Sequence, residues 1–282
     1  VDHKQQVSIR AGAAFFQITA MDSEDYPELP DVNGKSCVTM PQSALKAMIS
    51  GTIFSVSENQ ARPIQTGCLM EVTEDSVTMV AVDSFRLARR TWHTENAANH
   101  TLKFVVPAAG LKEIERILED SDEPVTFTLG DKHILFSIGD ALLVSRVLEG
   151  EFIDWRRVVP TNCGTVLTAN VAELTSSIER VSLIISEKVK SPVRCVFGDN
   201  MADFRTANTI GSAHDTCSIA GNGGELEIGF NSRYLLDALR VIPSEEVTLE
   251  LQNGLSPIVF TPCDKKYDFA YMVLPVRLRS NS

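Results

Sequence analysis

A short strand-like segment followed by an amphipathic helix recurs four times along the chain. In each helix the apolar residues fall three or four positions apart, which is the spacing of one helical face. Pro or Asn stands near each helix start, where both residues are favoured. The strand and helix segments are 37–41 with 43–49, 103–107 with 110–118, 166–170 with 172–181, and 226–231 with 232–240. The leucines that open the four stripes lie 66, 63 and 61 positions apart: Leu45, Leu111, Leu174 and Leu235. The sequence therefore predicts four copies of one unit.

Alternating apolar and polar positions with tight turns separate the helices. These patterns predict two three-stranded meanders, over 125–129, 134–138 and 142–147, and over 247–251, 258–260 and 269–274. Each unit is then a helix with three or four antiparallel strands, and two units make one domain. Helices packed on one face of curved sheets give an α+β fold.

The first residues predict a hairpin, with strands over 7–10 and 15–19 joined at Ala11-Gly12. Two strands are too few to be stable alone, so we expect this hairpin to be the end of a domain.

A segment from Glu149 to Pro160 separates the second unit from the third. It holds Trp155, a pair of arginines and a closing proline, and a comparable proline-containing segment occupies 22–30. Tyr26 and Trp155 lie 129 positions apart, which is a domain length. We therefore predict three parts: a remnant over 1–31, a middle domain over 32–158 and a C-terminal domain over 159–282.

Composition narrows the class of protein. With 44% hydrophobic residues, the 282-residue chain can bury a core, and no apolar run approaches the ~18 to 20 residues that span a bilayer. The N-terminus has no signal-peptide pattern. Six scattered cysteines without a C-x-x-C spacing indicate reduced thiols and no zinc site. These observations predict a cytoplasmic protein with no membrane segment, metal or cofactor.

The formal charge of −11 argues against simple DNA binding. Proteins that grip DNA by neutralising phosphates are usually basic, and an acidic chain is repelled at long range. Any role on DNA would need local basic patches or topological enclosure.

The residues offer no catalytic constellation. The five histidines are dispersed, and His214-Asp215 follows Gly211-Ser212 without a G-x-S-x-G elbow. The glycine-rich segment 221–224 precedes a strand, so a turn is a better interpretation than a phosphate cradle. Two acidic clusters, within 71–75 and 119–123, do not have the spacing of a calcium loop. The sequence therefore predicts that the protein is not an enzyme.

The segment from Ala81 to Arg90 combines a turn, an aromatic residue and three arginines. The residues alone favour a strand-turn-strand corner with an Asp83–Arg86 ion pair.

This corner is one of three motifs that resemble the bacterial DNA polymerase III β sliding clamp family. Residues 81–88, Ala-Val-Asp-Ser-Phe-Arg-Leu-Ala, resemble its A-T-D-x-x-R-L-A. The segment 150–160 resembles G-x-F-P-D-Y-R-R-V-L-P, and 271–278 resembles Y-V-V-M-P-M-R-L. The departures include Val82 for Thr, Ser84 for Gly and Ile153 for Pro.

The resemblance implies the DNA clamp fold, with β-α-β units repeated, antiparallel sheets outside and helices on the inner face. It implies a non-enzymatic processivity factor that encircles duplex DNA and tethers the replicative polymerase. The expected partners are duplex DNA, the polymerase alpha subunit, the clamp loader and other proteins with Q-x-x-L-F-like segments, and the full-length protein would form a homodimeric ring. Because that ring joins the first domain to the third, we expect this chain not to close it. The alternative is a peptide-binding α+β scaffold that does not encircle DNA.

The resemblance also implies two sets of site residues. The first set lines a partner-peptide groove between the middle and C-terminal domains: Ser84, Phe85, Arg86, Leu87, Ile153, Arg157, Val158, Val189, Asn231, Tyr234, Leu255, Pro257, Met272, Val273, Leu274, Pro275, Val276, Arg277 and Leu278. The second set would face DNA: Lys46, Lys112, Arg116, Arg180, Arg233 and Arg240. Acidic residues share the same helices (Glu113, Glu115, Glu179 and Asp237), so the sequence by itself does not establish a basic lining.

Overall fold

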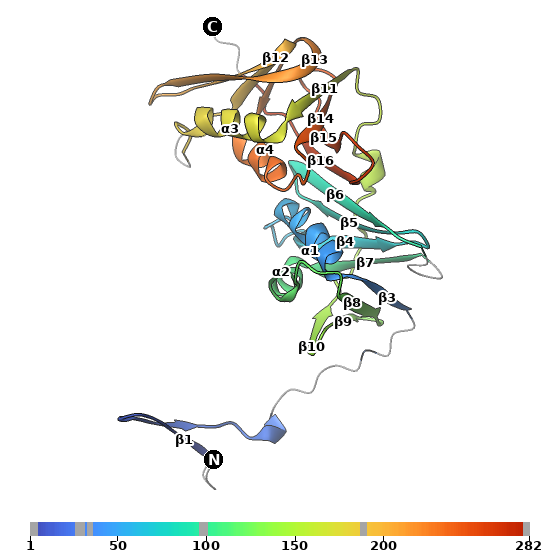
Figure 1. Ribbon diagram of the computed structural model, residues 1–282, viewed down its shortest axis with the longest axis vertical. Helices are drawn as coiled ribbons and strands as arrows, with labels where there is room; N and C mark the ends of the chain where they lie inside the picture. Colours follow the sequence, from blue (N-terminus) through green and yellow to red (C-terminus); the bar gives the residue numbers. More distant parts are fainter. Residues whose placement is uncertain (1–4, 26–31, 33–35, 96–100, 187–190, 279–282) are drawn as a thin grey trace.

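The structure is a computed structural model that describes residues 5–25, 32, 36–95, 101–186 and 191–278. Four helices line the concave side of the molecule and the sheets lie behind them (Figure 1). The helices are α1 (Gln42–Ser50), α2 (Ala108–Ile117), α3 (Val171–Ser182) and α4 (Ser232–Leu239). The predicted α+β class and the position of the helices on one face are confirmed.

Each helix follows a strand, as the repeat predicted. From α1 to α4, the preceding strands are β3 (Ser36–Pro41), β7 (Leu102–Pro107), β11 (Thr165–Asn170) and the end of β13 (Ser212–Phe230). Asn170 and Asn231 cap α3 and α4, because their side-chain oxygens accept the backbone N–H groups of Glu173 and Arg233. The four leading leucines are all at most 2% exposed. Their stripes therefore face the core.

The apolar side chains form two main cores, one for each pair of units. The middle region, 36–154, packs α1 and α2 against its strands, and the C-terminal region, 156–278, packs α3 and α4 in the same way. Further strands of the middle region are β4 (Gly67–Val72), β5 (Ser76–Val82), β6 (Arg86–His93), β8 (Pro124–Leu129), β9 (His133–Ile138) and β10 (Ala141–Arg146). Those of the C-terminal region are β12 (Val193–Ala207), β14 (Glu246–Leu251), β15 (Ile258–Pro262) and β16 (Phe269–Val273).

One antiparallel sheet crosses from one region to the other. Its strand order is β12-β13-β11-β14-β15-β16-β6-β5-β4-β7, and a separate sheet has the order β10-β9-β8-β3. The crossing point is the pairing of β16 with β6, which runs from Phe269 opposite Arg90 to Val273 opposite Arg86. The corner at Asp83 and the C-terminal segment therefore lie side by side, although nearly two hundred positions separate them.

A third, smaller core seals this junction. It is built from nine buried residues of both regions and of the connecting segment: Leu69, Val80, Val82, Leu87, Val105, Phe152, Val259, Ala270 and Met272. Beside it, the ring of Tyr271 stacks on Phe269 with centroids 4.9 Å apart and meets the edge of Phe54 at 5.7 Å. Phe54 belongs to the middle region, so Tyr271 packs across the junction.

The glycine-rich segment 221–224 is not the turn that the sequence predicted. It lies inside β13, where the register with β12 shifts on both sides of the Asp199–Asn222 pair. Gly221 and Gly224 have φ values of +114° and +61°, which glycine adopts without strain. The extra residues form bulges that bend one long strand.

The N-terminal hairpin is confirmed as β1 (Gln6–Ala11) paired with β2 (Ala14–Thr19). Three of its apolar side chains, Phe15, Phe16 and Ile18, are more than half exposed.

Replacing Tyr271 with alanine should destabilise the chain by about 3 to 5 kcal/mol, the usual cost of removing a buried aromatic ring. Urea unfolding followed by circular dichroism measures the change. Leu255→Ala is the control, because Leu255 is 75% exposed and should change the free energy of unfolding by less than about 0.5 kcal/mol. Equal effects of the two variants would contradict the role of Tyr271 at the junction.

Candidate functional site

The turn between β5 and β6 is organised by the carboxylate of Asp83. Its Oδ1 accepts the backbone N–H groups of Phe85 at 2.7 Å and Arg86 at 2.9 Å. Its Oδ2 accepts the Arg86 Nε–H at 3.0 Å. The corner with an Asp83–Arg86 ion pair, expected from the residues alone, is confirmed.

Arg86 then joins this corner to the C-terminal region. Its Nη1 donates to Asp237 Oδ2 on α4 at 2.6 Å. The guanidinium carbon also lies 4.5 Å from the ring centroid of Tyr234 and 5.6 Å from that of Phe54. Arg86 contacts two carboxylates and two rings, and its side chain is only 10% exposed, so it does not offer a free cation to a partner.

Apolar side chains next to Arg86 remain open to solvent. Phe85 is 54% exposed and stacks on Tyr234, with ring centroids 5.8 Å apart and planes 21° apart. The backbone carbonyl of Phe85 accepts the N–H of Leu274 at 2.8 Å, so Leu274, which is 36% exposed, lies beside the stack. The structure thus brings together Phe85, Tyr234 and Leu274 from three distant segments.

The other predicted groove residues differ in how far their side chains are exposed. Leu87, Met272 and Val273 are buried at the junction, so they lie beneath the surface and do not line an open wall. Exposed side chains are Ser84, Ile153, Arg157 (paired with Asp154 at 3.1 Å), Leu255, Val276 and Arg277, and partly exposed ones are Val158, Asn231, Pro257, Pro275 and Leu278. Val189 lies outside the described residues.

Residues 274–278, here called the tail, are held against β13. The Val276 N–H donates to the carbonyl of Gly229 at 2.7 Å. A Cβ at position 229 would lie 2.5 Å from Leu278 Cδ2 and 2.8 Å from the Val276 carbonyl oxygen. Only glycine lets the tail approach this closely.

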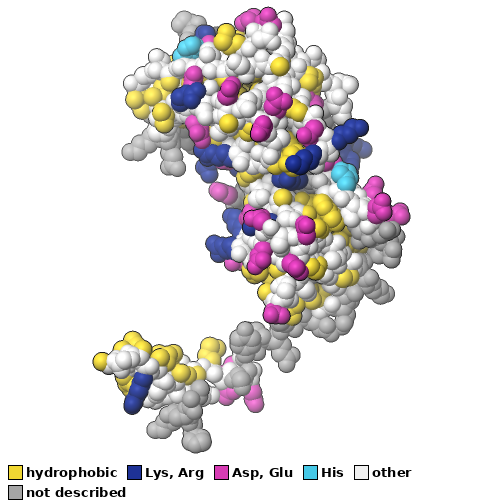
Figure 2. Space-filling model, viewed as in Figure 1, with side chains coloured by type: hydrophobic (Ala, Val, Ile, Leu, Met, Phe, Trp, Pro, Cys, Tyr) yellow, Lys and Arg dark blue, Asp and Glu magenta, His cyan; other side chains and the backbone are white. Residues whose placement is uncertain are grey.

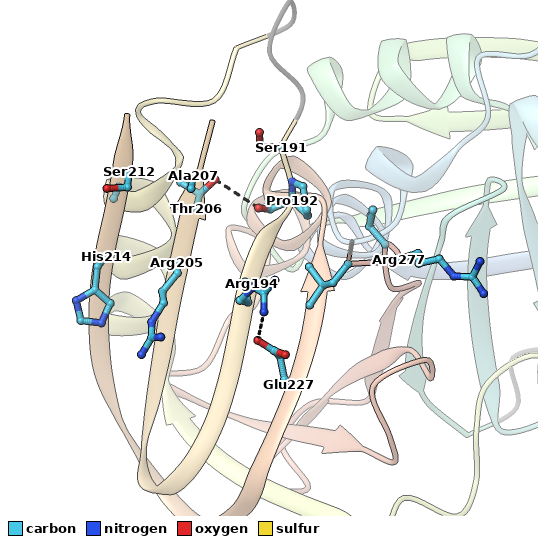
Figure 3. A pocket seen from close by; sticks show the side chains of 13 residues that line it. Ser191, Pro192, Arg194, Arg205, Thr206, Ala207, Ser212, His214, Glu227 and Arg277 are labelled. Atoms are coloured by element: carbon cyan, nitrogen blue, oxygen red, sulfur yellow. Dashed lines mark hydrogen bonds and ion pairs between the residues drawn. The ribbon is translucent and has the colours of Figure 1, made fainter. Parts of the chain in front are cut away.

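Behind the tail is a polar hollow of about 1160 Å³ that the sequence did not reveal (Figure 3). Arg194 pairs in it with Glu227 at 2.5 Å, and Arg205 and His214 share Asp203 at 2.6 Å each. Burial raises the pKa of Asp203, but hydrogen bonds from Arg205 and His214 outweigh it and bring that pKa below its usual value. These residues come from β12 and β13, and the pairing of the two strands brings them together, with Arg205 directly opposite His214. No motif in the sequence marked them.

The connecting segment is fixed to the middle region by one carboxylate. Glu71, whose side chain is 9% exposed, accepts the Trp155 indole N–H at 3.2 Å and Arg156 Nη2 at 2.8 Å. The guanidinium of Arg156 lies 4.2 Å from the Trp155 ring centroid, and that of Arg89 lies 5.7 Å away. Burial raises the pKa of Glu71, yet the hydrogen bonds from Arg156 and Trp155 and the charges of Arg156 and Lys103 lower it more.

The four helices and the residues that end them form the concave side of the molecule, here called the helical face. It carries the six predicted DNA-facing residues, and Figure 2 shows Lys and Arg side chains along it. Five of the six form ion pairs: Lys46 with Asp120 (3.1 Å), Arg116 with Glu113 (3.0 Å), Arg180 with Asp215, Arg233 with Asp237 (4.0 Å) and Arg240 with Glu179 (2.8 Å). Lys112 is exposed and has no carboxylate partner among the described residues. The basic face is therefore largely neutralised.

Within the described part of the chain, no three His, Cys, Asp or Glu side chains come together as a metal site. No helix among those residues is long and apolar enough to cross a membrane.

Glu71→Gln should weaken the acid sensitivity of folding. Because the folded pKa of Glu71 is lowered, its carboxylate stabilises the fold above the unfolded pKa of about 4.3. That stabilisation is lost as the pH falls through the folded value. We expect the variant to be less stable than wild type at pH 7, with a difference that shrinks towards pH 3. Denaturant unfolding across this range measures it, and a difference independent of pH would contradict the assignment.

Gly229→Ala should release the tail, because the new methyl group meets Leu278 and the Val276 carbonyl. The amide of Val276 should then exchange with solvent deuterium at least about tenfold faster, as expected when a backbone hydrogen bond opens more often. Gly164→Ala is the matched control, since a Cβ there meets nothing within 4 Å. Unchanged exchange at Val276 in Gly229→Ala would refute the close fit.

Two family models cover the two regions of the chain. The model for the central domain of the DNA polymerase III beta subunit matches residues 39–154, and the model for its C-terminal domain matches residues 156–277. The beta sliding clamp of Staphylococcus epidermidis is 30% identical over 274 residues, covering 96% of this chain and 72% of that protein.

Solved structures give the same relationship. A putative DNA polymerase III beta subunit from Eubacterium rectale superimposes with a TM-score of 0.91 at 32% identity, over 98% of this chain and 74% of that one. The DNA polymerase sliding clamp of Bacillus subtilis has a TM-score of 0.91 at 29% identity, over 99% and 74%. A Pseudomonas aeruginosa sliding clamp bound to griselimycin has a TM-score of 0.90 at 28% identity, over 98% and 75%. The matched domains, the identity over nearly the whole chain and the shared fold show that this chain belongs to the DNA polymerase III beta subunit family, the bacterial sliding clamps.

Proposed function

We propose that the protein is a processivity clamp: a cytoplasmic, non-catalytic accessory subunit that encircles duplex DNA and holds the replicative polymerase on it. Residues 32–158 and 159–282 act as two successive clamp domains. In the full-length protein a second copy completes the ring. The polymerase alpha subunit, the clamp loader and other clamp-binding proteins dock on the groove. The observation that carries this proposal is the apolar set at the junction, in which exposed Phe85 and Leu274 lie beside the partly buried Tyr234.

The chemistry of this set suits a short hydrophobic peptide. Two large apolar side chains buried at about 1.5 to 3 kcal/mol each contribute most of the attraction, and association costs remove part of it. Binding in the micromolar range, about −8 kcal/mol, is the expected strength. Such an affinity lets several partners exchange on one clamp.

The rigidity of the site supports the same proposal. Arg86 ties the turn that carries Phe85 to α4, which carries Tyr234, and the Leu274 N–H is bonded to the Phe85 carbonyl. A peptide therefore meets a preformed surface, and the cost of ordering it is small.

The DNA part of the proposal rests on the helical face. All four helices lie on the concave side, where a duplex inside a ring would pass (Figure 1). The four helices carry net charge zero, whereas the whole chain carries −11. The balance is five basic and five acidic side chains: Lys46, Lys112, Arg116, Arg180 and Arg233 against Glu113, Glu115, Glu173, Glu179 and Asp237. A neutral lining in an acidic protein favours enclosure of DNA over tight phosphate binding.

A labelled peptide containing a Gln-x-x-Leu-Phe segment tests the groove by fluorescence anisotropy. Phe85→Ala should weaken its binding about tenfold, or about 1.4 kcal/mol. Leu142→Ala should leave binding unchanged, because the exposed Leu142 lies on β10, away from the junction. Met272→Ala is a poor probe, since Met272 is buried and its loss would disturb the junction core.

The peptide test also separates the clamp from other roles. If wild type does not bind the peptide, or binds it equally well after Phe85→Ala, the groove assignment fails. A scaffold that binds peptides without enclosing DNA would pass this test. The full-length protein separates the two roles. A clamp stays on closed circular DNA at high salt and leaves once that DNA is linearised, whereas a scaffold leaves both forms equally.

A further inference from the structure

Two ion pairs on the helical face have both partners exposed. The Arg116 and Glu113 side chains are 74% and 58% exposed, and those of Arg240 and Glu179 are 57% and 44% exposed. Exposed pairs of this kind contribute little to folding, about 0 to 1 kcal/mol. Their carboxylates therefore act mainly on the electrostatic potential outside the helices.

The geometry of two pairs makes this effect strong. Within α2, Arg116 Nη1 reaches both carboxylate oxygens of Glu113, at 3.0 and 3.2 Å. Between α3 and α4, Arg240 Nη2 donates to Glu179 Oε1 at 2.8 Å. Separations of about 3 Å are far below the screening length of about 8 Å at physiological salt, so a nearby phosphate meets a dipole in place of a free positive charge.

We infer that Glu113 and Glu179 limit the grip of the helical face on duplex DNA, because each holds an arginine that would otherwise pair with a phosphate. This inference rests on the proposed function, in which the duplex passes this face. A phosphate must displace the carboxylate before it gains the arginine, so each contact is weak and short-lived. Fewer firm phosphate contacts also mean fewer released counterions and a shallow dependence on salt. Both consequences suit a clamp that moves along DNA.

The double variant Glu113→Gln/Glu179→Gln tests this inference in the 282-residue chain. Both side chains are exposed, so the variant should fold as wild type does. Its affinity for a fluorescein-labelled duplex, measured by anisotropy from 25 to 200 mM salt, should rise about tenfold at low salt. The slope of log affinity against log salt should steepen by up to about 2, since two arginines become free for phosphates.

A matched control removes two carboxylates from arginine pairs elsewhere. Glu149 pairs with Arg146 three positions away, as Glu113 does with Arg116. Ser145 faces α2, since its Oγ would lie 3.0 Å from a Cβ added at Gly110. Successive side chains of a strand alternate, so Arg146 points to the opposite side of β10. Glu227 pairs with Arg194, which alternates with the buried Val193 and Cys195 and so faces away from the helices. Glu149→Gln/Glu227→Gln therefore makes the same change in net charge away from the helical face.

The outcomes separate the inference from the proposed function. Tighter binding by Glu113→Gln/Glu179→Gln, but not by the control, supports the inference. Unchanged binding by the first variant overturns it, because affinity would then not depend on these carboxylates. An equal gain in both variants also overturns it, because affinity would then follow net charge alone. Adding Arg116→Ala and Arg240→Ala to the first variant should abolish the gain. A gain that survives these changes would overturn the inference, because the carboxylates would then repel DNA by their own charge and not by holding the arginines. The DNA part of the proposed function would stand in that case.

Discussion

The contacts of Arg86 hold the functional junction together. Asp83 fixes the guanidinium within its own turn, and Asp237 fixes it to α4 in the other region. Both carboxylates are largely buried, and so is Arg86, so these charge-assisted bonds are screened less than a surface pair would be. Removing one partner would leave a charge buried without compensation, which is far more costly than losing an exposed ion pair.

This arrangement explains why an apolar surface can stay open at the junction. Phe85 stacks on Tyr234, whose ring also lies 4.5 Å from the Arg86 guanidinium, and Leu274 is placed by a backbone hydrogen bond. None of the three needs to be buried to be held in place. The apolar atoms are therefore available to a partner, while the polar bonds that position them lie underneath.

The same residues connect the groove to the helical face. Asp237 Oδ2 accepts a hydrogen bond from Arg86 at 2.6 Å and lies 4.0 Å from Arg233 Nε. The pairing of β16 with β6 and the packing of Tyr271 on Phe54 make the two regions one body around this carboxylate. The peptide surface and the concave lining thus share one polar centre.

The sequence by itself determined the local elements and the class of fold. Apolar spacing located the four helices, the meanders and the N-terminal hairpin, because the periodicity of each element is a local property. The three motifs located the corner, the connecting segment and the tail. The glycine-rich segment was misread as a turn, because the pairing of Asp199 with Asn222 that keeps it in β13 is a long-range contact.

The tertiary structure decided which side chains are available. Sequence could not distinguish exposed Phe85 from buried Leu87 or Met272, because their burial depends on β16 pairing with β6 across the junction. Nor could it show that Arg86 is fully engaged, or that a hollow lies behind the tail. The sequence also left the charge of the helical face undetermined, and the structure resolved it into specific pairs. Residues such as Glu179 and Arg240 are 61 positions apart, and only the packing of α3 against α4 brings their charges together.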